Sequence, residues 1–133
     1  MISKLGNRRR RAAAAVELAV VTPVLLTMLF GIIEFGWIFT VRQALVTAAR
    51  EGARTAVLPG STVAEVEQRI AEYTQPLGLT GCTTQVSCDD GGNPDGTVTI
   101  SIPYATISLV GDYFGCLDGD LTATCSMRKE TVD

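Results

Sequence analysis

The sequence contains no histidine among its 133 residues, which removes the commonest general base and the commonest metal ligand of proteins. Aromatic residues make up 6% of the chain and charged residues 19%, whereas hydrophobic residues make up 47%. The chain has no phosphate-binding glycine loop, no dinucleotide-binding glycine pattern and no EF-hand spacing. Its one basic cluster is short, which disfavours nucleic-acid binding. These absences predict a protein that is not an enzyme and that binds no metal, no cofactor and no nucleic acid.

Hydrophobic residues are concentrated in one N-terminal stretch. It covers residues 12–41, is interrupted only by Glu17 and Glu34, and contains 18–33 as a run without any charge. About 20 apolar residues in a helix cross the hydrocarbon core of a bilayer, so the stretch is long enough to be a transmembrane anchor. A cleavable secretory signal has a shorter apolar region that ends in a small-x-small site, and this stretch ends without one. The sequence therefore favours a retained anchor.

Charge is divided unevenly along the chain. Residues 1–40 carry five basic and two acidic side chains, a net charge of +3, whereas residues 41–133 carry six basic and twelve acidic side chains, a net charge of −6. The basic tract directly before the apolar stretch consists of Arg8, Arg9, Arg10 and Arg11. By the positive-inside rule, the N-terminus stays in the cytoplasm and the chain from about residue 42 onward is exported. The lipid bilayer is thus the first predicted partner.

All four cysteines lie in the exported part. An even number of cysteines in a small domain on the oxidising side of a membrane indicates two disulfides. Of the three possible connectivities we favour the local pairs, Cys82–Cys88 and Cys116–Cys125, with unpaired buried thiols as the alternative. The pairs have five and eight intervening residues, which fits a zinc site poorly.

The first half of the chain has the pattern of helices. A long helix is predicted from Ala12 to the Pro59-Gly60 breaker pair, with a kink at Pro23 because proline removes one backbone hydrogen bond. Thr62 and Glu65 form a capping-box pattern that opens an amphipathic helix over 63–75. The apolar side of that second helix consists of Val63, Val66, Ile70 and Tyr73.

The second half of the chain has the pattern of strands. Apolar and polar residues alternate cleanly over 97–103 and 121–127, and more weakly over 83–88, which predicts strands. The stretch 105–114 is ambiguous between a short helix and a loop. The predicted fold class is α+β, with a long N-terminal helix packed on a small antiparallel sheet of about three strands.

Glu17 is the most informative single residue, because a carboxylate in a membrane helix costs a few kcal/mol unless something pairs with it. One interpretation is that Glu17 reaches back into the lipid headgroups at the cytoplasmic end. The other is that it awaits a positive partner within the apolar layer. If the chain were cut after Ala12, Glu17 would be the fifth residue of the product, and the new ammonium at Ala13 of one subunit could pair with Glu17 of a neighbour. Glu34 is expected near the outer interface, where it reaches water, and is given no role.

Small residues recur at every fourth position along the second part of the long helix. Such small-xxx-small spacing allows helix backbones to approach closely. The residues are Gly36, Thr40, Ala44, Ala48, Gly52 and Ala56. Partner helices are the favoured contact for 36–40. For 44–56, partner helices and the domain's own sheet remain equal alternatives.

Two stretches carry a family resemblance: RRRAAAAVELAVVTPVLLTMLFGIIEFG over 9–36 and RQALVTAAREGAR over 42–54. They resemble the N-terminal module of the TadE-like pseudopilins, minor components of tight-adherence (Tad, or Flp-type) pili. The final stretch LTATCSMRKE is similar to the closing strand of that family. The resemblance implies a basic leader over 1–12, removed by a prepilin peptidase between Ala12 and Ala13, although prepilin leaders usually end in glycine. It further implies an assembly helix over 13–41 and a pilin-like extracytoplasmic domain over 42–133.

Taken together, the sequence predicts a minor pseudopilin, a structural component of an adhesive Tad-type pilus. Its expected partners are other pilin and pseudopilin subunits, the prepilin peptidase and the inner-membrane assembly platform. Its expected location is the inner membrane as a single-pass protein, with incorporation into an extracellular pilus. The alternative is a single-pass anchored extracytoplasmic binding module with no role in a pilus.

Overall fold

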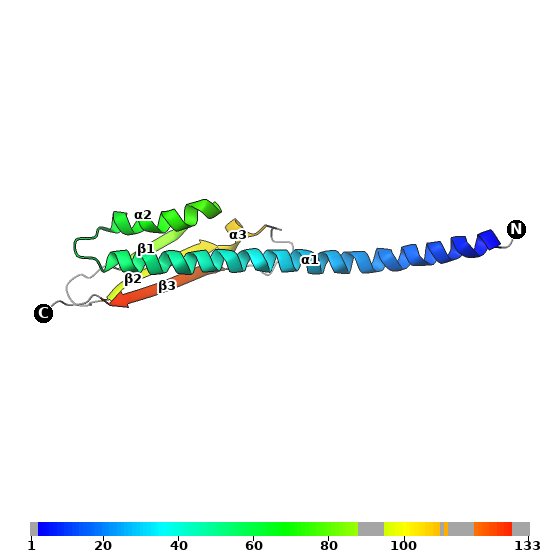
Figure 1. Ribbon diagram of the computed structural model, residues 1–133, viewed down its shortest axis with the longest axis horizontal. Coiled ribbons are helices and arrows are strands. Elements are labelled where there is room, and N and C mark those ends of the chain that lie inside the picture. Colours follow the sequence, from blue (N-terminus) through cyan, green and yellow to red (C-terminus); the bar gives the residue numbers. More distant parts are fainter. Residues whose placement is uncertain (1–2, 88–94, 110, 112–118, 129–133) are drawn as a thin grey trace. The chain divides into compact units, whose positions relative to one another are not determined.

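The computed structural model describes residues 3–87, 95–109, 111 and 119–128, with side chains described from residue 10 onward. In chain order, the elements are α1 (Ser3–Ala56), α2 (Val63–Thr74), the 3-10 turn η1 (Gln75–Leu77), β1 (Thr83–Ser87), β2 (Asp95–Pro103), α3 (Tyr104–Ile107) and β3 (Asp120–Arg128) (Figure 1). The chain divides into two compact units, Met1–Phe35 and Gly36–Asp133, and α1 contributes residues to both.

The N-terminal unit consists of the first part of α1. The helix begins at Ser3 rather than at Ala12, so the predicted start was wrong. The reason is that Lys, Leu and Arg in the leader are good helix formers, and adding turns to an existing helix avoids the cost of nucleation. The helix continues through Pro23, while the Thr27 hydroxyl donates a hydrogen bond to the Pro23 carbonyl at 2.8 Å. The kink at Pro23 stays a prediction.

The C-terminal unit contains a three-stranded antiparallel sheet in the order β1-β2-β3. The register pairs β2 with β3 over nine consecutive residues, from Asp95 opposite Arg128 to Pro103 opposite Asp120. The alternating apolar residues of β2 are fully buried, and their polar neighbours on the other face are partly exposed. The alternation therefore predicted this strand and its buried face correctly, and the α+β class is confirmed.

The core of the C-terminal unit lies between the sheet, the last part of α1 and α2. Figure 1 shows the end of α1 running beside the sheet with α2 close to it. The elements approach closely at Gly52 of α1, where an added Cβ would lie 3.0 Å from the Ile70 side chain of α2 and 3.4 Å from Val98 of β2. The largest fully buried side chains are Leu45, Ile100, Ile102, Val41, Val66 and Val98.

The start of α2 has the capping box that its sequence predicted. The Thr62 hydroxyl accepts a hydrogen bond from the Glu65 backbone N–H at 3.3 Å, and the Glu65 carboxylate accepts one from the Thr62 N–H at 3.0 Å. The apolar face was predicted only in part: Val63 is 48% and Tyr73 37% exposed, whereas the two central residues of the face are buried. Val63 and Tyr73, in the first and last turns of α2, therefore lie outside the core that the middle of the helix covers.

The ambiguous stretch after β2 contains one helical turn, α3, followed by extended backbone at Ser108. The turn is held at its start by a hydrogen bond from the Tyr104 N–H to the Gly119 carbonyl at 3.1 Å. Residues 110 and 112–118 of this stretch lie outside the described part of the chain.

Candidate assembly helix and neighbouring sites

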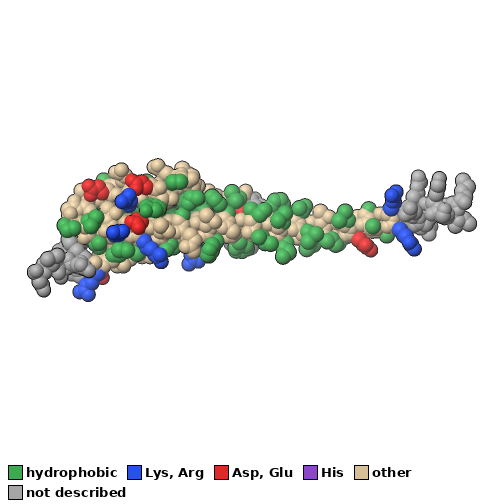
Figure 2. All heavy atoms as spheres, in the orientation of Figure 1, with side chains coloured by type: hydrophobic (Ala, Val, Ile, Leu, Met, Phe, Trp, Pro, Cys, Tyr) green, Lys and Arg blue, Asp and Glu red, His purple; other side chains and the backbone are tan. Residues whose placement is uncertain are grey.

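The apolar stretch of α1 presents its large side chains outward. Between positions 16 and 39, most large hydrophobic side chains have exposed fractions of 46–73%. The most apolar 18-residue window of α1 has a mean hydropathy of 2.3, and none of it is buried. Figure 2 shows hydrophobic side chains along this part of the helix. An exposed apolar surface of this extent is typical of contact with a membrane or another protein, and the helix fits a single-pass membrane anchor.

Glu17 lies within this apolar surface and is exposed, and Arg10 and Arg11 are exposed before it. Among the described side chains no ion pair involves Glu17, so its carboxylate points outward from a single copy of the chain. The predicted cleavage residues, Ala12 and Ala13, are exposed positions of α1. The side chains of Arg8 and Arg9 lie outside the described residues.

The stripe of small residues divides into two parts. Gly36 and Thr40 are exposed, and a Cβ added at Gly36 would meet no atom within 4 Å. In contrast, Ala48 and Gly52 are buried in the core of the C-terminal unit.

Ala44 and Ala56, the remaining residues of the stripe, are half-buried. Ala56 lies against Gly96 of β2, where an added Cβ would be 3.4 Å from the Ala56 side chain. For 44–56 the sequence left partner helices and the domain's own sheet as equal alternatives. Positions 48–56 pack inside their own unit, because their small side chains allow α2 and the sheet to approach α1. Only 36–40 remain for a partner.

Two residues near the end of the apolar stretch differ from expectation. Glu34 is buried, at 7% exposed, rather than open to water. Trp37, which the sequence analysis gave no role, donates its indole N–H to the Ile107 carbonyl at 2.7 Å. Trp37 is the single tryptophan of the chain, and its position at the end of an apolar run is the pattern of an interfacial aromatic. Its partner, 70 residues further along, has no such local indication.

Cys82 and Cys125 are half-buried, and the strand register keeps them apart. Cys82 directly precedes Thr83 of β1. Thr83 pairs with Ser101 of β2, and Ser101 pairs with Thr122 of β3, which lies three residues before Cys125. With strands about 4.8 Å apart and a rise of about 3.3 Å per residue, their Cα atoms are about 16 Å apart. A disulfide spans at most about 6.8 Å between Cα atoms. The connectivity that joins Cys82 to Cys125 is thus excluded.

The favoured pairs, Cys82–Cys88 and Cys116–Cys125, each include a residue outside the described part, Cys88 or Cys116. They stay a prediction. Burial raises the pKa of the Cys82 thiol.

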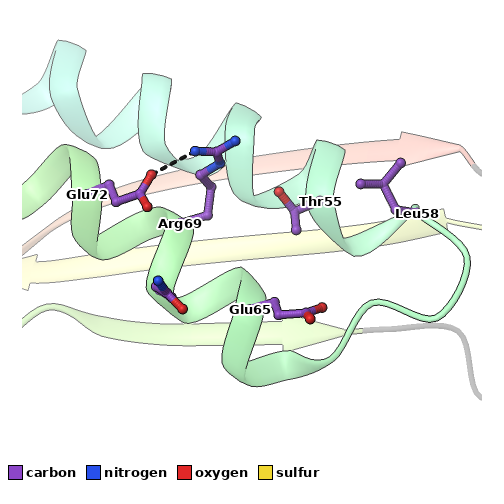
Figure 3. Close-up of a pocket in the computed structure, with 6 residues that line it drawn as sticks. Thr55, Leu58, Glu65, Arg69 and Glu72 are labelled. Atoms are coloured by element: carbon purple, nitrogen blue, oxygen red, sulfur yellow. Dashed lines mark hydrogen bonds and ion pairs between the residues drawn. The ribbon is translucent and has the colours of Figure 1, made fainter.

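A shallow hollow of about 260 Å³ lies between the end of α1 and α2 (Figure 3). On the α2 side of the hollow, Arg69 donates to the Glu72 carboxylate one turn further along the helix at 2.7 Å, and this hydrogen bond raises the pKa of Arg69. Both side chains are about half exposed, so the pair is a surface ion pair of small energetic weight. The hollow is lined by Thr55, Leu58, Glu65, Gln68, Arg69 and Glu72.

Comparison with known proteins adds one finding. Residues 12–54, all within α1 and about a third of the chain, match the model of a family described as TadE-like protein. No curated protein and no solved structure matches the chain. The resemblance inferred from the sequence is confirmed over this segment. The match indicates a structural component associated with the Tad pilus.

Proposed function

We propose that the protein is a minor pseudopilin of a Tad-type adhesive pilus, anchored in the inner membrane by α1 until it is incorporated. The observation that carries the proposal is that the residues matching the TadE-like family include all those that present the exposed apolar surface of α1. In this function the surface first contacts lipid and then contacts the helices of neighbouring subunits. The basic tract before it keeps the N-terminus in the cytoplasm.

Exchange of lipid for helix contacts gives little hydrophobic gain, because lipid tails are as apolar as the side chains that leave them. Association then depends on close backbone approach and on polar pairs. Gly36 and Thr40 support close approach, since both are exposed small residues and Gly36 has open space around it. They mark the part of the small-residue stripe that receives a partner helix.

Glu17 supplies the polar pair. A carboxylate in the apolar layer costs a few kcal/mol, and an ammonium group on a neighbouring subunit offsets that cost only at one axial offset between the two helices. Cleavage between Ala12 and Ala13 by the prepilin peptidase creates that ammonium. Glu17 thereby sets the stagger of adjacent subunits, and the C-terminal unit, pilin-like and stapled by disulfides, faces outward. The assembly platform and sister subunits complete the set of partners.

The test combines N-terminal sequencing with two variants of the full chain. With the peptidase present, the membrane-bound protein is expected to begin at Ala13 with the anchor retained. Glu17→Gln is expected to abolish recruitment to pili without reducing membrane insertion, because the amide keeps the size and loses the charge. Glu67→Gln is the matched control, since Glu67 is an exposed acid of α2, and it is expected to be recruited normally.

Two results would count against the proposal. Unchanged recruitment of Glu17→Gln would disprove the charge pairing. A chain that begins at Met1 with and without the peptidase would favour the anchored binding module instead.

A further inference from the structure

The outer boundary of the membrane segment can be placed by counting along α1. A span of about 20 residues rises about 30 Å, the thickness of the hydrocarbon core. Counted from Leu18, where the uncharged run begins and with Glu17 at the inner edge of the apolar layer, such a span ends at Trp37. Glu34 lies within it but is buried, and the next charged residue of α1 is Arg42. Tryptophan is enriched at this boundary, so Trp37 lies where the bilayer meets water.

The hydrogen bond of Trp37 holds α3 next to this residue, and therefore near the predicted boundary of the bilayer. The indole donates to the Ile107 carbonyl at 2.7 Å, and Ile107 is the last residue of α3. The α3 turn is itself fixed at both ends, by bonds from Tyr104 to Gly119 and from Ser108 to Tyr104, each at 3.1 Å. The Ile107 backbone and the end of α3 therefore lie beside Trp37 within the C-terminal unit.

The chemistry of this segment suits lipid. Residues 102–109 contain no charged side chain. Leu109 is 59% exposed although it is a large apolar residue, whereas Ile107 is buried beneath it in the core. Among the described residues, the exposed charged groups on neighbouring elements include Asp120, opposite Pro103 in the sheet, and Arg42 of α1. Both are exposed, and the headgroup layer accommodates them.

We propose that the end of the C-terminal unit formed by Trp37, α3 and Leu109 rests on the outer surface of the bilayer, with Leu109 among the lipids. The occupant of this surface is lipid and not a protein. The inference deepens the proposed function, because it rests on α1 being a membrane anchor. The C-terminal unit then has a second contact with the membrane before assembly. Extraction of the protein into a pilus must break this contact as well as remove α1 from the bilayer.

The experiment places the photoreactive residue benzoylphenylalanine at one of three leucines in the full chain, reconstituted in phosphatidylcholine–phosphatidylglycerol nanodiscs. The three are matched in exposure: Leu25 of the apolar stretch at 58%, Leu58 after α1 at 56%, and Leu109 at 59%. After irradiation, intact mass reports covalent lipid adducts. Adducts are expected at 25 and 109 and none above background at 58.

The outcomes separate this inference from the proposed function. Adducts at 25 but not at 109 would disprove the contact of Leu109 with lipid and would leave the membrane anchor supported. Absence of adducts at 25 would overturn both. Protein–protein adducts at 109 in place of lipid adducts would show that the surface belongs to a subunit contact. Trp37→Phe keeps an aromatic ring and removes the indole N–H that donates to Ile107. This variant is expected to lower the yield of lipid adducts at 109 without changing the yield at 25.

Discussion

Gly52→Val tests whether the buried part of the small-residue stripe is filled by the protein's own α2. A Cβ at this position already lies 3.0 Å from Cγ1 and Cδ1 of Ile70 and 3.4 Å from Val98, and valine adds two methyl groups beyond it. Overpacking of a well-packed core costs about 1–3 kcal/mol. Replacing a helical glycine by valine recovers about 0.3–0.5 kcal/mol. The expected net loss of stability is about 1–2.5 kcal/mol.

The assay is hydrogen exchange of β2 amides in the full chain, because β2 is the central strand and opens with its unit. Since about 1.4 kcal/mol corresponds to a tenfold change, exchange is expected to speed up by about 5- to 60-fold in Gly52→Val. Gly36→Val is the matched control. It gains the same helix propensity and meets no atom, so its exchange is expected to stay within about twofold of the native protein.

Equal exchange in the two variants would refute the reasoning, because Ile70 would then have to move aside without cost. Gly52→Ala gives an intermediate point. Its single added carbon makes the contact with Ile70 but gains about 1 kcal/mol of helix propensity, so its stability is expected to remain close to that of the native protein.

Three further predictions concern other parts of the C-terminal unit. Thr62→Ala removes the cap of α2 and is expected to cost about 1 kcal/mol, measured as faster exchange in α2; no change would show that the cap bond is not formed. Ile100→Ala leaves a cavity in the core at a fully buried position and is expected to cost about 2–5 kcal/mol, measured by denaturation; a loss below 1 kcal/mol would contradict this burial. In the reduced protein, alkylation of Cys82 is expected to be slower at pH 8 than that of a small thiol and to rise at higher pH, because a raised pKa leaves less thiolate; equal rates would contradict the burial of the thiol.

Local patterns predicted the local structure well. The spacing of Thr62 and Glu65 predicted a capping box because both partners of the two hydrogen bonds lie within one turn of chain. The alternation over 97–103 predicted β2 because one face of the sheet is buried and the other is not. The long apolar run predicted a membrane-spanning segment in α1. Length and composition alone support that prediction, without reference to the rest of the chain.

Features that depend on distant residues could not be predicted. Small residues such as Gly52 suit a partner helix and an internal contact equally, and only the position of Ile70 decides between them. The bond of Trp37 to Ile107 joins residues 70 positions apart in the chain. The two local cysteine pairs stay predictions, because Cys88 and Cys116 lie outside the described residues.

Because α1 is one unbroken helix from Ser3 to Ala56, a pulling force applied to its first part is carried directly into the folded unit. Figure 1 shows the strands running alongside the last part of α1. The side chains that join helix and sheet, among them Val41, Leu45 and Ala49, are therefore loaded together in shear rather than one after another. The packing of helix against sheet therefore resists a force applied along the axis of α1.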